Sequence, residues 1–323
     1  MKRAEQKMYW KIYLFALLLF VNYHFVISEI LTDRPIIGIV IQPTVAYPEF
    51  GTNYVPSSYK KWIEAAGARA AVIDYRLPFS KIKELFNSVN GILFIGGSTD
   101  IVPECRFIQV CNYLFNLTIE AKDKHNETVP IWGTCLGFEQ LAVYATGDYK
   151  ILDSFSAENI SYPLKFTNEL KDSRLFSQAS SEVIYNLQNY KVTINQHSYG
   201  ISSSESNKHE SFKKYKEFFR IISTNVDKKG KPFISTVEAY NYPIYSSQWH
   251  PERAVYEWNS GIVINREKSI VVSNYVGRFF ISEARKNSHS FSSPTEEYNL
   301  LFYNFKDIYD ESLKPWYETV YFW

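Results

Sequence analysis

Short apolar runs alternate with amphipathic stretches along the first half of the chain. Apolar, β-branched runs occupy residues 36–41, 70–73, 91–95 and 129–132. Between them, residues 59–66, 80–86 and 105–122 carry apolar side chains at helical spacing, with Gly67 closing the first stretch and Ser80 expected to cap the second. Strands and helices that alternate in this way predict a parallel sheet covered by helices on both faces.

The alternation stops after Gly147. The polar stretch 202–216 indicates either an exposed loop or a charged helix face. Around it the chain carries shorter β-like runs, which we expect to be antiparallel additions to the same domain. These runs cover residues 192–194, 219–223, 233–238 and 244–247.

Residues 129–142, VPIWGTCLGFEQLA, pass from an apolar strand through a turn into a helix-favouring run, and glycines stand two residues either side of Cys135. In hydrolases with a G-x-S-x-G elbow, such a turn lifts the nucleophile above the sheet at a helix N-terminus. The partial positive charge of the helix end favours a thiolate there. We therefore predict that Cys135 is a nucleophile; the alternative is a buried cysteine in an ordinary turn.

The strand at 91–95 ends in Gly96 and Gly97. Function in parallel sheets collects at the carboxyl ends of strands, so this turn and Cys135 are expected at the same edge. A backbone N–H from Gly97 and a second from Leu136 would form an oxyanion hole. The alternative is a plain turn that terminates a strand.

A candidate base and its carboxylate occur in the segment SQWHPE at 247–252. Pro251 holds His250 extended, so the side chains of His250 and Glu252 project the same way if the strand geometry persists through this segment. A carboxylate bound to one imidazole nitrogen leaves the other free to take the thiol proton. We predict a triad of Cys135, His250 and Glu252, with a structural histidine as the alternative for His250.

The N-terminus indicates export. Basic residues at 2, 3, 7 and 11 precede an apolar run at 12–21, and Val26, Ile27 and Ser28 suit a signal peptidase. We predict a signal peptide over residues 1–28; the alternative is an anchor that stays in the membrane.

Asparagines in N-x-S/T sequons and an odd number of cysteines agree with this route. The sequons begin at Asn116, Asn126 and Asn159. With three cysteines at least one thiol has no partner within the chain, and Cys105 and Cys111 can bridge only if they do not share one helix.

Charge, length and the lack of one motif limit the possible functions and the number of domains. The 35 basic residues nearly balance the 34 acidic ones, so the basic excess of a nucleic-acid-binding protein is absent from the sequence. The 323 residues suffice for one large domain or two small ones. No P-loop pattern for ATP occurs.

The elbow, the GGS turn at 96–98 and the QWHPE segment together resemble the class I glutamine amidotransferase fold. That likeness implies a flavodoxin-like, three-layer α/β sandwich with a mostly parallel central sheet. The runs ISTVEAYNYPIYSSQWHPE at 234–252, YEW at 256–258 and EARKN at 283–287 more closely resemble the gamma-glutamyl hydrolase family. We expect one catalytic domain over residues 29–323, in which 288–323 form a C-terminal extension that matches the family loosely.

The resemblance implies cysteine-dependent hydrolysis of γ-glutamyl bonds in folylpoly-γ-glutamates and antifolate polyglutamates through a thioester, without metal or cofactor. It implies a small-molecule partner, a homodimer, and a lysosomal, vacuolar or extracellular glycoprotein that is not held in a membrane after signal cleavage. Cys135, His250 and Glu252 match the family triad. Two alternatives stay open: a glutaminase or other γ-glutamyl peptidase of this fold, and a non-catalytic binding relative.

Further residues are expected near the substrate. His197 belongs to an N-x-H segment that resembles one beside the family's cleft, although an ordinary loop histidine is an equal alternative. Glu139, one helical turn beyond Cys135, matches a family acidic position, and we place Gly96 at the substrate as well.

Overall fold

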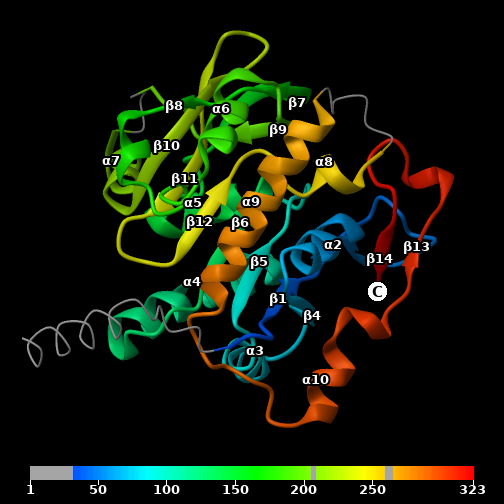
Figure 1. The fold of residues 1–323 in the computed structure, drawn as a ribbon. Helices are drawn as coiled ribbons and strands as arrows, with labels where there is room; N and C mark the ends of the chain where they lie inside the picture. Colours follow the sequence, from blue (N-terminus) through cyan, green and yellow to red (C-terminus); the bar gives the residue numbers. More distant parts are fainter. Residues whose placement is uncertain (1–31, 205–208, 259–264) are drawn as a thin grey trace, which may run out of the picture.

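The computed structural model describes residues 32–204, 209–258 and 265–323 (Figure 1). The predicted signal peptide, residues 1–28, lies outside the described residues. None of the helices in the described ranges is both long and apolar enough to cross a bilayer.

The central sheet has eight strands in the order β4-β1-β5-β6-β12-β11-β10-β8. The strands are β1 (Ile36–Val40), β4 (Arg69–Ile73), β5 (Gly91–Phe94), β6 (Ile131–Thr134), β8 (Lys165–Phe166), β10 (Phe219–Val226), β11 (Pro232–Ala239) and β12 (Ile244–Ser247). The first five in the order run parallel, and β11, β10 and β8 are antiparallel additions. The prediction that the strands after Gly147 are all antiparallel is wrong for β12, which pairs in parallel with β6.

Helices cover both faces of this sheet, as predicted. Every residue of β1, β5 and β6 is buried, so neither face of these strands can be left to solvent. One face packs against α3 (Phe79–Phe86), α4 (Arg106–His125), α5 (Leu136–Thr146) and α7 (His209–Phe218). The other packs against α2 (Ser57–Ala65), α6 (Ser181–Asn189) and α9 (Arg266–Ala284), which gives the three-layer α/β sandwich (Figure 1).

Local details differ from the sequence expectations. Helix α3 begins at Phe79 with Pro78 in the N-cap position, so the prediction of Ser80 as the cap is wrong. Proline fixes the extended entry to the helix without a side-chain acceptor. The polar stretch 202–216 contains the start of helix α7, which favours the charged helix face. Cys105 directly precedes α4 and Cys111 is buried inside it, and both are free thiols.

A small two-stranded antiparallel sheet stands apart from the central one. It pairs β7 (Asp153–Tyr162) with β9 (Thr193–Gly200). The sequence indicated only the first residues of β9, because Asn195, Gln196 and His197 have little strand preference. An isolated β-bridge between Ile194 and His250 connects β9 to the chain three residues after the end of β12.

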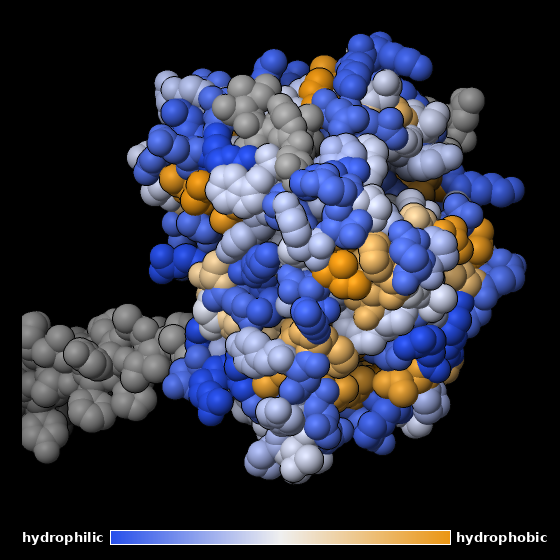
Figure 2. All heavy atoms as spheres, turned by 90° about the vertical axis from the view of Figure 1, so that its right-hand side faces the viewer, coloured by the Kyte–Doolittle hydropathy of each residue, from blue (hydrophilic) through white to orange (hydrophobic). Residues whose placement is uncertain are grey.

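The C-terminal extension is part of the fold. After α10 (Pro294–Leu300), strands β13 (Asp307–Ile308) and β14 (Val320–Phe322) join β3 (Asn53–Pro56) and β2 (Gln42–Pro43) in a four-stranded sheet. The red C-terminal strand thus lies beside the blue N-terminal segment in Figure 1, and the Trp323 carbonyl accepts hydrogen bonds from the backbone N–H of Thr52 and Asn53 at 2.9 and 3.0 Å. On this side of the molecule, hydrophilic side chains surround small groups of apolar ones (Figure 2).

The remaining elements are short. They are α8 (Arg253–Tyr256) and 3-10 turns at Asn168–Asp172, Phe302–Asn304 and Glu311–Leu313.

Candidate active site

Cys135 occupies a strained turn between β6 and α5. Its backbone has φ 54° and ψ −105°, a conformation that costs a residue with a side chain about 1–3 kcal/mol. The turn is tight because α5 starts directly against β5: a Cβ on Gly137 would lie 2.3 Å from the Phe94 carbonyl oxygen. The strand–turn–helix geometry expected from the sequence is present.

Neighbouring strands bring the histidine to this turn. β6 and β12 are parallel neighbours in which Thr134 pairs with Ser247, and the Cys135 N–H donates to the Ser247 carbonyl at 2.9 Å. His250 follows three residues later, where its own N–H donates to the Ile194 carbonyl at 2.8 Å. Cys135 and His250 therefore lie at the same edge of the sheet.

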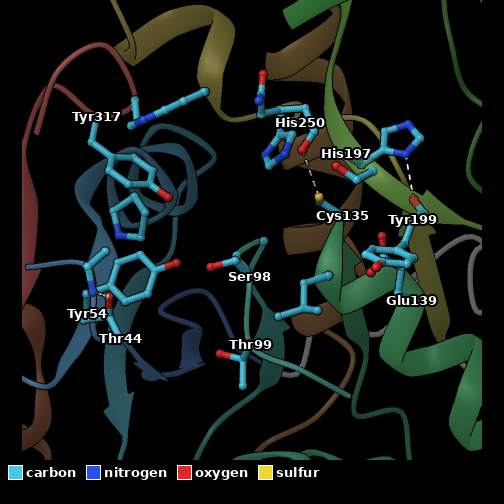
Figure 3. Close-up of a pocket in the computed structure, with 18 of the residues that line it drawn as sticks. Thr44, Tyr54, Ser98, Thr99, Cys135, Glu139, His197, Tyr199, His250 and Tyr317 are labelled. Carbon is cyan, nitrogen blue, oxygen red and sulfur yellow. Dashed lines mark hydrogen bonds between the residues drawn. The ribbon is translucent and has the colours of Figure 1, made fainter. Parts of the chain in front are cut away.

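The imidazole of His250 is oriented by a buried carboxylate. Its Nδ1 lies 2.7 Å from Glu252 Oε1. When Nδ1–H donates to Glu252, Nε2 carries the lone pair. Nε2 is buried and has no hydrogen-bond partner within the part of the chain that the structure describes, so it is a base available to a nearby proton. Figure 3 shows His250 and Cys135 beside one another, with the Cys135 sulfur 3.8 Å from the Gln196 carbonyl oxygen.

Gly96 lies between these groups. A Cβ at Gly96 would stand 2.7 Å from His250 Cε1, 3.2 Å from Cys135 Cβ and 2.8 Å from the Tyr59 hydroxyl. The Gly96 N–H donates to that hydroxyl at 2.7 Å, and the hydroxyl is 3.5 Å from His250 Nδ1. Tyr59 was missed by the sequence analysis, because an aromatic residue on an amphipathic helix resembles an ordinary core residue.

Gly97 and Leu136 line the same cavity as Cys135 and His250. A Cβ on Gly97 would lie 1.6 Å from Gln42 Oε1, so only glycine fits the turn as it stands. The Gly96 N–H is committed to Tyr59, which leaves Gly97 as the candidate oxyanion donor of the pair. The Leu136 N–H lies next to the Cys135 sulfur, where it acts to lower the pKa of the thiol.

The thiol of Cys135 does not have the lowered pKa expected at a helix N-terminus. Burial raises its pKa well above the usual range, and the Glu139 and Glu252 carboxylates raise it further. A helix terminus stabilises a charge by about 0.3–1 kcal/mol, whereas full burial can shift a pKa by about 3–5 units. Burial wins, and the thiol is neutral in the free protein.

Glu139 adds a titratable group beside the nucleophile. Its N–H donates to the Cys135 carbonyl at 3.0 Å, and Gln248 Nε2 donates to Glu139 Oε1 at 3.0 Å. Desolvation raises the pKa of the Glu139 carboxyl to about 7. The charge near Cys135 therefore changes close to neutral pH.

His197 lies in the same cavity but is held by β9 itself. Its Nδ1 is 2.7 Å from the Tyr199 carbonyl oxygen and its Nε2 is 3.2 Å from Asn195 Oδ1. Burial lowers the pKa of His197 to about 4, so the ring is neutral. Because both ring nitrogens contact protein atoms, His197 is better suited to a structural role in the cavity wall than to binding the substrate directly.

All the sequence-predicted site residues line one cavity of about 600 Å³: Gly96, Gly97, Cys135, Leu136, Glu139, His197, His250 and Glu252. The sequence analysis missed Tyr54, Tyr59, Arg253 and Tyr317 in the lining. Tyr317 comes from the C-terminal extension, so no local pattern could connect it with Cys135.

Known proteins resemble this chain over most of its length. Residues 35–252 match the peptidase C26 family. Human gamma-glutamyl hydrolase is 38% identical over 279 residues, which cover 85% of this chain and 86% of the relative. Gamma-glutamyl hydrolase B of Dictyostelium discoideum is 33% identical, with 86% of this chain and 80% of the relative covered, and gamma-glutamyl hydrolase 1 of Arabidopsis thaliana is 31% identical, with 90% and 83% covered. The chain therefore belongs to the gamma-glutamyl hydrolase family, peptidase C26.

Proposed function

We propose that this protein hydrolyses γ-glutamyl bonds in folylpoly-γ-glutamates and antifolate polyglutamates through a thioester on Cys135. The observation that carries the proposal is that Cys135 and His250 line the same cavity. There the Glu252 carboxylate lies 2.7 Å from the His250 imidazole and orients it. The activity named for the relatives supports the bond class.

In the first half of the reaction, Cys135 Sγ attacks the γ-carbonyl carbon while His250 Nε2 accepts the thiol proton. Because the pKa of the free thiol is raised, the proton leaves sulfur during the attack rather than before it. Backbone N–H groups of Gly97 and Leu136 stabilise the oxyanion. When the C–N bond breaks, the imidazolium gives its proton to the departing amine.

The second half reverses these roles. Water enters where the amine left, and His250 Nε2 removes a proton as the water oxygen attacks the thioester carbon. Collapse of the second oxyanion breaks the C–S bond, and sulfur recovers the proton from His250. Glu252 stabilises the imidazolium in both halves by accepting the Nδ1–H bond.

The proposal includes the secretory route. The side chains of the sequon asparagines Asn116, Asn126 and Asn159 are all exposed, which supports glycosylation there. We propose a lysosomal, vacuolar or extracellular glycoprotein that assembles as a homodimer. A glycosidase-induced loss of mass and light scattering of the purified protein test these two points.

The test of the activity uses pteroylpentaglutamate at acidic and neutral pH, with products separated by chromatography. We expect release of glutamate or short γ-glutamyl chains by the wild type, no turnover by Cys135→Ala, and normal turnover by Cys105→Ser, whose thiol lies outside the cavity lining. Glutamine is assayed in parallel. Ammonia release from glutamine without cleavage of the pentaglutamate would favour a glutaminase, and binding without any product would favour a non-catalytic relative.

A further inference from the structure

One wall of the cavity is built from segments far apart in the sequence. Tyr54 comes from β3 near the N-terminus, and Trp316 and Tyr317 come from the C-terminal extension. Figure 3 shows Tyr54 and Tyr317 on the side of the cavity away from His197 and Glu139. Arg253, the first residue of α8, also lines this side through its contacts with Trp316 and Tyr317.

Arg253 is a buried cation with donors to spare. Only 5% of the surface of Arg253 is exposed to solvent. Nη2 donates to the Trp316 carbonyl at 2.7 Å, and the guanidinium carbon stands 5.4 Å from the centre of the Tyr317 ring. A guanidinium has five N–H donors, and burying a charge is costly unless it is paired. The hydrogen bond to Trp316 and the contact with Tyr317 use only part of that capacity.

The nearby carboxylates of Glu252 and Glu257 attract Arg253, and each of them has one oxygen bound to another group and one buried oxygen without a hydrogen-bond partner among the described residues. Glu252 Oε1 is bound to His250, and Glu257 Oε2 accepts the Glu318 N–H at 2.6 Å. Within the described residues neither carboxylate hydrogen-bonds Arg253, so an incoming anion can compete for the guanidinium.

The charges around the cavity are uneven. Among the described residues that line it, Arg253 is the sole lysine or arginine, whereas the acids are Asp100, Glu139, Glu158 and Glu252. Tyrosine hydroxyls accompany the cation: Tyr54 donates to Gln42 Oε1 at 2.7 Å and hydrogen-bonds Tyr317. Burial raises the pKa of Tyr317 to about 12, so its hydroxyl keeps its proton.

We propose that Arg253 and Tyr317 form a subsite for the α-carboxylate of the γ-glutamyl residue whose γ-carbonyl is attacked by Cys135. This rests on the proposed function. The α-carboxylate carbon is four bonds from the γ-carbonyl carbon, about 5 Å away in an extended chain. Arg253 and Cys135 line the same cavity, and Arg253 follows His250 by three residues in the chain. A planar guanidinium fork matches a carboxylate with paired hydrogen bonds.

The competing explanation is that Arg253 only balances the charges of Glu252 and Glu257. Its loss would then disturb His250 and slow every substrate alike. The subsite predicts instead a loss confined to substrates that carry the α-carboxylate.

The experiment compares two substrates, a γ-glutamyl anilide with a free α-carboxylate and the same anilide with an α-carboxamide. We expect the wild type to prefer the carboxylate by about 10- to 100-fold in kcat/KM. Arg253→Gln should bring the ratio close to one, Arg253→Lys should give an intermediate ratio, and Tyr317→Phe, which keeps the ring under the guanidinium, should lower it several-fold. The control Arg76→Gln changes an arginine outside the cavity lining that is 49% exposed and paired with Asp74, and it should leave the ratio unchanged.

An equal fall for both substrates in Arg253→Gln, or a wild type without preference, overturns the subsite while γ-glutamyl hydrolysis stands. Should Arg253→Gln not fold, an unchanged ratio in both Arg253→Lys and Tyr317→Phe overturns it. A wild type that cleaves neither anilide nor pteroylpentaglutamate overturns the proposed function and the subsite together.

Discussion

His250 Nδ1 lies 2.7 Å from Glu252 Oε1, and both side chains are almost completely buried. A buried hydrogen bond to a charged acceptor is stronger than an exposed one, so the imidazole is held in one tautomer and one orientation. Because Pro251 separates the two residues, the relationship is fixed by a three-residue segment of backbone. It makes Glu252 the group that fixes the orientation of the His250 imidazole.

Replacing Glu252 by Gln should lower kcat by about 10²- to 10⁴-fold, because an amide can hold the imidazole in the wrong tautomer and does not stabilise the imidazolium. The measurement is steady-state hydrolysis of pteroylpentaglutamate. Glu217→Gln, at an exposed position of α7, is the matched control and should keep wild-type kcat. Wild-type kcat in Glu252→Gln would remove Glu252 from the triad.

The strain at Cys135 should be measurable in stability. Both Cys135→Ala and Cys135→Gly should be inactive, yet the glycine variant should unfold with a free energy about 1 kcal/mol larger than the alanine variant. The reason is the positive φ of 54°, which glycine adopts without a steric penalty. Equal unfolding curves in urea, or a more stable alanine variant, would show that the turn relaxes when the sulfur is removed.

Glu139 should make the protein less stable as pH rises. Its pKa is 4.5 in an unfolded chain and about 7 in the fold, so the folded state binds more protons between these values and the free energy of unfolding falls across that interval. Glu139→Gln removes this dependence. Its gain in melting temperature over wild type should be larger at pH 8 than at pH 5, and a free-energy difference of at most about 3 kcal/mol is expected. A gain that is the same at both pH values contradicts the raised pKa.

Gly97→Ala should lower kcat by about 10²- to 10³-fold if the Gly97 N–H stabilises the oxyanion, since a methyl group overlaps the Gln42 amide, which is buried and bound by Tyr54, and pushes the turn away from it. The double variant Gly97→Ala with Gln42→Ala opens the space and should recover part of the rate. Single-turnover kinetics separates this effect from substrate binding. Because alanine keeps the backbone N–H, undiminished kcat in Gly97→Ala would contradict the prediction that the methyl group displaces this donor.

The sequence was sufficient wherever one local pattern decides the outcome. Apolar runs at strand spacing and amphipathic runs at helical spacing predicted the layered α/β sheet, because burial on both faces leaves few alternatives. The glycines around Cys135 predicted the turn. The segment at 250–252 predicted that His250 and Glu252 pair, although the structure makes this contact through a turn and not through a continued strand. The cap of α3, the direction of β12 and the pKa of Cys135 were wrong, since each depends on neighbours that are distant in sequence.

Only the tertiary structure decided which residues surround these predicted groups. Tyr59 reaches Gly96 and His250 from a helix that resembles core, and Arg253 contacts Trp316 and Tyr317, which lie just before the C-terminal strand β14 that pairs with β3. The sequence by itself determined the elbow, the base with its carboxylate, and the sheet that carries them, because these follow from contacts within a few residues. Cavity walls, charge balance and titration follow from burial and from contacts between distant segments, and these exist only once the chain has folded.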